Sequence, residues 1–421
     1  MKTAILMLFG LLLSVAGMAD TVLTVSVGNS SETDRTDEPV VIDINSYAPV
    51  KSATVTLNGT DIPCQIDDLD GDKTADELCF LADVKAGQTL SYTVTLSPQA
   101  VQKVYTPRVY AEMLLSNKKV KEANKQNLYI SGLTVENGVN AYWMIHHHGA
   151  AFENELVAYR IYFDHRQTVD IYGKYRKGLE LKDTQFYPDD EQKAAGYGDD
   201  VLWVGSTFGL GALRGWDGQK PTMLEDVAHR TQRIVAAGPL RTIIEVKDEG
   251  WTPQPNNYPL DMTTLYTLYA GQRDCRVDIS FDHEQAVAVA VADETGDKQQ
   301  AGLFSTGIIN VKGSTEYTDH EGLRACWGTD WPVSAKDSVG HKRETVGLGI
   351  YIPKQYIASE QPADKDNYAF IVKPDDNNRL SYRITFASDN ETFGPHSDNE
   401  WFDLLKAWRR DVEQPLTISI R

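Results

Sequence analysis

The chain of 421 residues has few basic side chains and no apolar run long enough to span a membrane. Lys and Arg number 41 against 60 Asp and Glu, which gives a formal net charge of −19. Nucleic-acid binding depends on Lys and Arg contacts to phosphates, so this balance argues against nucleic acid as a partner. A transmembrane helix needs about 20 consecutive apolar residues, so we expect no membrane insertion.

Several catalytic sequence patterns are also missing. Neither GxGxxG nor GxxxxGK[ST] occurs, so the glycines of residues 205–218 do not form a phosphate loop. No Gly-x-Ser-x-Gly elbow supports serine-hydrolase chemistry. No HExxH or HxxxH spacing supports a zinc site. Any chemistry must therefore come from a site of another kind.

Residues 1–19 have the pattern of an export signal. Lys2 is followed by an apolar run over Ala4–Val15 and by the small residues Ala16–Ala19, where cleavage is expected. No cysteine follows the expected cleavage site, so a lipid anchor is not indicated. We expect a mature chain that is soluble and periplasmic.

Cysteine is scarce, with four residues in the whole chain. Disulfides form readily in exported proteins, and four cysteines allow three connectivities. We predict pairing of Cys64 with Cys79, which flank a short acidic loop, and of Cys275 with Cys326. Four free thiols are the alternative.

Short runs rich in Val, Ile and Thr, bounded by Gly, Asn, Asp and Pro, recur along the chain. They predict an all-β fold with few helices: a small β-sandwich over residues 20–105, then a large antiparallel β-supersandwich over residues 106–421. Helical spacing appears only in Ser116–Gln126 and Asn399–Val412. The second helix packs on a sheet or, alternatively, presents its tryptophans as a sugar platform.

An acidic loop over residues 68–76 has the spacing of a calcium site. Its oxygen ligands alternate along the sequence, a glycine follows the second aspartate, and the flanking segments are expected strands. Ca²⁺ takes six to eight oxygen ligands, and a tight loop can direct alternate side chains toward one ion. We predict a structural Ca²⁺, with a solvated hairpin tip as the alternative. The predicted ligands are Asp68, Asp70, Asp72, Thr74 and Asp76.

The densest polar segment covers residues 143–174. In its alternating run Leu156–Phe163, side chains two apart share a face, so Arg160 and Tyr162 lie together on a polar face. Trp143 and Lys174 are candidate substrate-binding residues at its ends. The candidate catalytic residues are His147, His148, Glu153, Glu155, Arg160 and Tyr162.

Three successive histidines, His146–His148, have three interpretations. Adjacent strand residues cannot all reach one ion, which argues against a transition metal. One histidine can be catalytic with Glu153 or Glu155 as its partner, because imidazole exchanges protons near neutral pH. The remaining interpretation is a polar loop that holds a satisfied core histidine.

A second cluster lies over residues 201–233. Its glycines let strands and turns approach closely, while arginine can bind a carboxylate and tryptophan can stack on a sugar. The alternative for its Trp-Asp-Gly segment is a hairpin turn. The candidate substrate-binding residues are Trp203, Arg214, Trp216 and Arg230.

Several of these segments, in this order, resemble the signatures of the domain-of-unknown-function family 4861. They are Asp67–Asp72 with Asp76–Leu78, Phe152–Glu155 with Ala158–Asp164, Leu202–Gly205, and Arg230–Arg233 with Gly238–Pro239. The resemblance covers nearly the whole mature chain and implies secretion by polysaccharide-degrading bacteria and work on carbohydrate. It also implies a fold similar to galactose-mutarotase-like supersandwiches. It supplies no catalytic residues.

We therefore expect a periplasmic enzyme that processes acidic, uronic-acid-containing oligosaccharides as a lyase or a glycoside hydrolase. In a lyase, Arg160 or Arg214 would neutralise the substrate carboxylate and His148 or Tyr162 would remove the adjacent proton. In a hydrolase, Glu153 or Glu155 would be the acid. The alternatives are a sugar mutarotase or epimerase and a non-catalytic glycan-binding protein. The sequence leaves the oligomeric state open.

Overall fold

The structure, a computed structural model, describes residues 19–47, 49–101, 103–116, 128–253, 259–282, 290–292, 298–300 and 302–421. The predicted signal peptide, apart from Ala19, and the predicted helix over Ser116–Gln126, apart from Ser116, lie outside the described residues. Within the described residues, no helix is both long and apolar enough to cross a bilayer.

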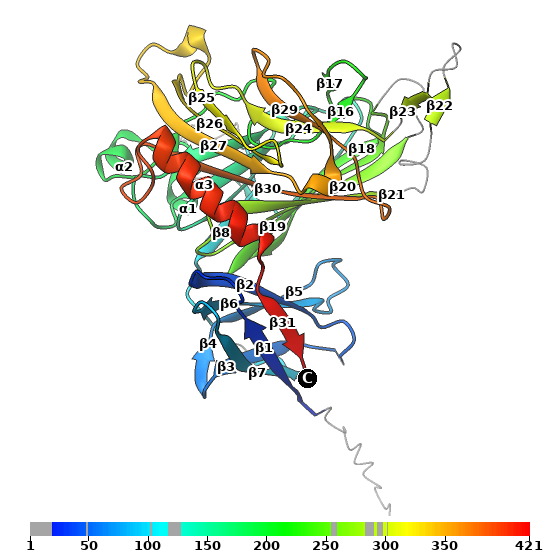
Figure 1. Cartoon of the computed structure of the whole chain (residues 1–421), viewed down its shortest axis with the longest axis vertical. Coiled ribbons are helices and arrows are strands. Elements are labelled where there is room, and N and C mark those ends of the chain that lie inside the picture. Colours follow the sequence, from blue (N-terminus) through cyan, green and yellow to red (C-terminus); the bar gives the residue numbers. More distant parts are fainter. Residues whose placement is uncertain are drawn as a thin grey trace, which may run out of the picture.

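The small sandwich consists of two antiparallel sheets (Figure 1). In β1, Leu23, Val25 and Val27 alternate toward the core between more exposed residues, as a half-buried strand requires. In spatial order the first sheet contains β31 (Thr417–Ile420), β1 (Thr21–Gly28), β7 (Thr89–Ser97), β3 (Ser52–Leu57) and β4 (Thr60–Ile62), and the second contains β2 (Arg35–Asp43), β6 (Glu77–Val84) and β5 (Cys64–Asp67).

The last strand of the chain belongs to the small sandwich. β31 pairs with β1, with Val25 opposite Ile420 and Gly28 opposite Thr417. The predicted domain boundary at residue 105, which placed this segment in the large sandwich, is wrong for β31. This strand forms the edge of the sheet beside β1 instead of adding to the large sheets (Figure 1).

The large sandwich has one continuous nine-stranded antiparallel sheet. Its central strands β19 and β20 pair over most of their length, from Arg241 opposite Tyr269 to Asp248 opposite Met262. In spatial order the strands are β11 (Gly132–Glu136), β18 (His229–Ala237), β19 (Arg241–Trp251), β20 (Leu260–Tyr269), β21 (Asp274–Asp282), β30 (Arg379–Ser388), β27 (Glu344–Tyr351), β26 (Leu323–Asp330) and β25 (Thr315–Thr318).

Two five-stranded sheets form the second layer, and one apolar core of buried side chains joins them to the nine-stranded sheet. One is β15 (Asp199–Asp200), β14 (Val169–Gly173), β13 (Ala158–Tyr162), β12 (Gly149–Asn154) and β8 (Val109–Glu112); the other is β17 (Pro221–Thr222), β16 (Arg214–Trp216), β24 (Phe304–Ile309), β29 (Asn367–Val372) and β28 (Ile357–Glu360). Two short ribbons add β9 (Leu114–Leu115) with β10 (Leu128–Tyr129), and β22 (Ala290–Ala292) with β23 (Lys298–Gln300).

Helices are few and short apart from the last one. Trp401 and Leu405 on α3 are fully buried against Leu323 and Tyr351 of the nine-stranded sheet, so this helix packs on the sheet and is not a sugar platform. The described helices are α1 (Leu181–Thr184), α2 (Asp190–Ala194) and α3 (Asp398–Glu413), with 3-10 turns η1 (Ala141–Trp143), η2 (Ala335–Asp337) and η3 (Lys354–Tyr356). The predicted all-β fold with few helices is thus confirmed.

The two sandwiches meet at the β5–β6 hairpin. Oε1 of Gln65 accepts the backbone N–H of Leu240 at 2.7 Å, and the Arg241 guanidinium pairs with Asp67 at 2.7 Å and with Glu77 at 2.9 Å. Arg241 is 2% exposed, so these charge-assisted contacts lie in a protected junction.

All four cysteines are buried free thiols, so the predicted disulfides are not found. Cys64 lies opposite Phe80, and Cys79 lies opposite Gln65. This offset of one residue turns the two side chains to opposite faces of the sheet. Cys275 on β21 and Cys326 on β26 are separated by β30 and β27, roughly 14 Å at the usual strand spacing.

Candidate functional site

The polar face predicted for the strand after Leu156 is present on β13. Arg160 and Tyr162 both bind Asp170 of the neighbouring strand β14: Arg160 through Nη2 at 2.6 Å and Tyr162 through its hydroxyl at 2.9 Å. Arg160 also donates to Asp200 at 2.7 Å and to the Tyr187 hydroxyl at 2.7 Å. One guanidinium therefore joins two carboxylates that are far apart in sequence.

These two carboxylates have different environments. The Asp170 side chain is fully buried and accepts four hydrogen bonds, whereas 20% of the Asp200 side chain is exposed. Burial, followed by the charge of Asp170, raises the pKa of Asp200 to about 8. A raised pKa favours the protonated form of Asp200 beside the ion pair of Asp170 and Arg160, and the protonated form is the one that a general acid needs.

The η1 turn brings aromatic side chains over Tyr162. The Tyr142 ring stacks on the His148 ring with centroids 3.8 Å apart, and it meets the Tyr162 ring edge-on at 5.1 Å. The neighbouring Trp143 is 64% exposed. His148 has a left-handed backbone with φ 73°, which is uncommon for a residue other than glycine. The turn therefore carries the exposed indole of Trp143 and stacks Tyr142 on the imidazole of His148.

His148 is neutral at physiological pH. Burial lowers its pKa to about 4, and the charges of Arg160 and Arg166 act in the same direction. Nδ1 lies 3.1 Å from the Tyr142 carbonyl oxygen, which can only accept, so Nδ1 carries the proton and Nε2 is the free acceptor.

Arg166 connects this aromatic group to Trp203. Its guanidinium lies 4.8 Å from the Tyr142 ring centroid and 4.9 Å from that of Tyr162. Nη1 donates to the Gly205 carbonyl at 3.3 Å, and the Trp203 ring lies beside the same glycine. Trp203 is 48% exposed. We call the resulting group the Tyr162 site: Tyr142, Trp143, His148, Tyr162, Arg166 and Trp203, with Arg160, Asp170 and Asp200 beneath it.

Sequence reasoning missed four members of this group, Tyr142, Arg166, Asp170 and Asp200. Asp170 could have been identified from the sequence, because it interrupts the apolar run Val169–Ile171; in the strand pairing it lies directly opposite Arg160. Asp200 could not, because it comes from a separate segment that pairs only with the end of β14.

Glu153, a predicted catalytic residue, is structural. It is fully buried, pairs with Lys174 at 2.5 Å and accepts the backbone N–H groups of Glu180 and Leu181 at the start of α1. Lys174, a predicted substrate-binding residue, is fully buried as well. Neither side chain can reach a substrate, because each is occupied and enclosed.

Two more predicted catalytic residues lie outside the Tyr162 site. Glu155 pairs with Arg108, which also binds Asp37 of the small sandwich at 2.6 Å, so this ion-pair chain ties the two sandwiches together. His147 is fully buried, and its Nε2 lies 3.2 Å from Glu112. Of the three histidines, His148 alone belongs to the Tyr162 site.

The residues of the second predicted cluster do not lie together at one site. Arg214 is 1% exposed and bonds to Thr168 and to the carbonyls of Leu213 and Thr207; burial lowers its pKa to about 10. Arg230 is buried and pairs with Asp248 at 2.8 Å. Trp216 is half-buried on β16. Only Trp203 of this cluster belongs to the Tyr162 site.

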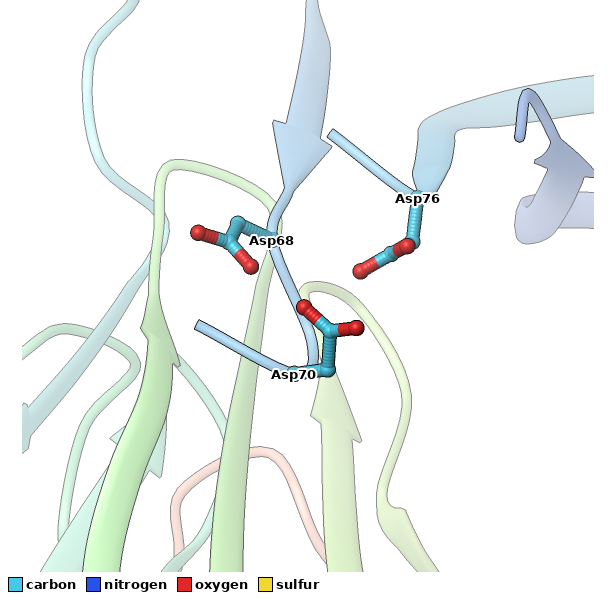
Figure 2. A group of neighbouring side chains, drawn as sticks. All are labelled: Asp68, Asp70 and Asp76. Carbon is cyan, nitrogen blue, oxygen red and sulfur yellow. The ribbon is translucent and has the colours of Figure 1, made fainter. Parts of the chain in front are cut away.

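The acidic loop forms the tip of the β5–β6 hairpin. Carboxylate oxygens of Asp68, Asp70 and Asp76 lie within 4.8 Å of one another, and Figure 2 shows the three groups turned toward a common space. Asp72 lies outside this group and accepts the Thr74 amide at 2.6 Å. The loop also touches the large sandwich, because Arg233 donates to the Leu69 carbonyl at 2.9 Å.

Comparison with known proteins gives a family but no activity. Two solved structures from Enterococcus faecalis, titled as a protein in glycosyl hydrolase family 38 and as an alpha-mannosidase, share 10% identity with a TM-score of 0.47. They cover 95% of this chain, which spans about half of theirs, 47% and 46%. No curated protein matches. A family model described as "Domain of unknown function (DUF4861)" matches residues 27–418, and the chain belongs to this family.

Proposed function

We propose that the protein is a carbohydrate-active enzyme whose reaction takes place at the Tyr162 site. The observation that carries this proposal is the stack of Tyr142 on His148, edge-on to Tyr162, whose hydroxyl shares Asp170 with Arg160; exposed Trp143 and Trp203 flank the group. Exposed indoles suit the apolar faces of sugar rings, and an acid and a base with separated pKa values suit proton transfer at neutral pH.

The reaction we propose is β-elimination from a uronic-acid-containing oligosaccharide. Nε2 of His148 removes the proton beside the substrate carboxylate, and the electron pair forms a carbon–carbon double bond as the adjacent glycosidic C–O bond breaks. The Asp200 proton goes to the leaving oxygen. The products are an unsaturated uronate and a new reducing end, and solvent then restores both proton carriers.

Arg166 is the group proposed to bind the substrate carboxylate. Its side chain is 19% exposed, whereas Arg160 and Arg214 are enclosed. Its Nη1 makes a long 3.3 Å bond to Gly205, which a substrate carboxylate can replace with a charge-assisted bond. Beside Asp200, Asp170 is fully buried, and Asp199 is 34% exposed but paired with Lys193 at 2.5 Å, so neither is free to act as the second carboxylate of a glycoside hydrolase.

Turnover of pectic, ulvan-type and arabinogalactan fragments tests the proposal. We expect the ultraviolet absorbance of an unsaturated uronate, with loss of turnover in His148→Ala and retention in His146→Ala. Reducing ends without this absorbance would identify a hydrolase. Exchange of anomers alone would identify a mutarotase, and binding without any reaction would identify a glycan-binding protein.

We also propose that the acidic hairpin binds a structural Ca²⁺. Asp68, Asp70 and Asp76 bring carboxylate oxygens together, as a hard cation requires. In this proposal the ion stabilises the hairpin and its contact with Arg233, and takes no part in the reaction. A periplasmic location is proposed with it, from the pattern of residues 1–19.

A further inference from the structure

A cavity of about 280 Å³ lies next to the Tyr162 site. Its walls come from the β11–η1 connection, the segment after β13 and the segment before β18. Pockets for drug-sized ligands usually measure about 300–1,000 Å³, so this one is of a size for a single small ring. The apolar part of its lining is Val135, Val139, Leu224 and Val227.

Two contacts join this cavity to the Tyr162 site. Asp164 lines the cavity and pairs with Arg166 at 2.6 Å. Asn140 lines it as well, and its side chain accepts the backbone N–H of Tyr142 at 3.0 Å, while the carbonyl of the same tyrosine binds His148. A ligand in the cavity would therefore contact residues that bind Tyr142 and Arg166 of the Tyr162 site.

The charge of the cavity is negative. Its cation, Arg230, is neutralised by Asp248 behind the wall and also donates to the Leu224 carbonyl. Asp164 is neutralised by Arg166. The remaining carboxylates, Glu136, Glu225 and Asp226, are exposed and form no ion pair with a described residue. Such a wall accepts hydrogen bonds from hydroxyl groups and repels a second uronate.

We propose that this cavity is a subsite for a neutral sugar residue adjoining the uronate. The inference rests on the proposed function, and it adds a substrate class: oligosaccharides in which a uronic acid adjoins a neutral, hydroxyl-rich sugar. Carboxylates on the rim bind the hydroxyl groups, and the valines and Leu224 of the lining contact the ring. Homopolymers of uronic acid are excluded by charge repulsion at Glu225 and Asp226.

Two fragments test the subsite: a uronate-containing disaccharide, and the trisaccharide that carries one more neutral hexose. We expect the trisaccharide to bind the wild-type protein at least about tenfold more tightly by calorimetry, and Glu225→Gln/Asp226→Asn to lose this gain. Asparagine tolerates the φ of 48° at position 226, so the fold is retained. Disaccharide binding should not change. Asp376→Asn, an exposed carboxylate elsewhere, is the matched control and should keep the gain.

Equal binding of the two fragments to the wild-type protein, or a gain that the double variant retains, overturns the subsite. The enzymatic proposal fails separately, when neither fragment is turned over. In that case a length-dependent gain that the double variant loses still establishes the subsite, now in a binding protein.

Discussion

The rings of Tyr142 and His148 lie 3.8 Å apart with their planes only 1° from parallel, and the Tyr142 carbonyl accepts a hydrogen bond from His148 Nδ1. One residue thus covers the imidazole and also fixes its tautomer. The left-handed backbone at His148, which costs energy outside glycine, is maintained by these contacts. The free Nε2 is the atom on which the proposed base chemistry depends.

The pH dependence of kcat/KM should be bell-shaped. His148 acts as a base only above its pKa of about 4, and Asp200 acts as an acid only below its pKa of about 8, so activity falls at both ends. Asp200→Asn should remove the alkaline limb and lower kcat by roughly 10²–10⁴-fold, since an amide cannot donate the proton. His146 has a pKa also lowered to about 4 by burial, so His146→Gln is the control and should retain both limbs.

Tyr142→Leu should move the acid limb of this profile upward. Burial is the main cause that keeps the His148 pKa low, and removal of the stacked ring lets water reach the imidazole. The pKa then rises toward its ordinary value of about 6.5. Titration of the His148 ring by NMR in the variant and the wild type measures the shift directly. An unchanged pKa would mean that other groups, and not Tyr142, shield His148.

Replacing Lys174 with Met should strongly destabilise the fold. The change leaves Glu153 charged and buried without its partner, which typically costs about 3–5 kcal/mol in the free energy of unfolding. Glu153→Gln/Lys174→Met should recover part of this loss, as denaturant unfolding can measure. A stable Glu153→Gln variant that had lost turnover would instead return Glu153 to the reaction.

Thiol titration of the denatured protein should find four reactive cysteines without added reductant. Cys64 and Cys79 face opposite sides of their sheet, and Cys275 and Cys326 are three strands apart. No small side-chain movement brings either pair within disulfide distance. A count of two reactive thiols, or of none, would show that the strands pair differently from the arrangement described above.

Strand alternation was the part of the sequence that could be interpreted reliably. It predicted the all-β fold and the shared face of Arg160 and Tyr162, because side-chain direction follows directly from a period of two. The strand register could not be predicted: Cys64 and Cys79 flank their loop almost symmetrically, yet the pairing of β5 with β6 is offset by one residue. The contacts of Asp200 and of β31 depend on tertiary placement, which no local pattern records.

The burial of charged side chains could not be predicted from the sequence either. Glu153, Lys174 and Arg214 have the side chains of a carbohydrate site, and the structure encloses all three. Charged residues are rarely buried without partners, so their presence in the two polar clusters did not indicate that they are buried. Arg166, a partly buried member of the site, follows the end of β13, where a strand pattern no longer predicts side-chain direction.

Removal of calcium should lower the melting temperature by a few degrees while leaving activity at lower temperature intact. A ligand that binds only the folded state stabilises it in proportion to its saturation, and the acidic loop lies at the junction of the two sandwiches through Arg233 and Leu69. Thermal unfolding with Ca²⁺ and with a chelator measures the effect. Asp76→Asn should abolish the difference and Asp376→Asn should preserve it. If chelation leaves the melting temperature of the wild type unchanged, the loop is a solvated hairpin tip; if it abolishes turnover at a temperature where the fold persists, the ion belongs to the active site.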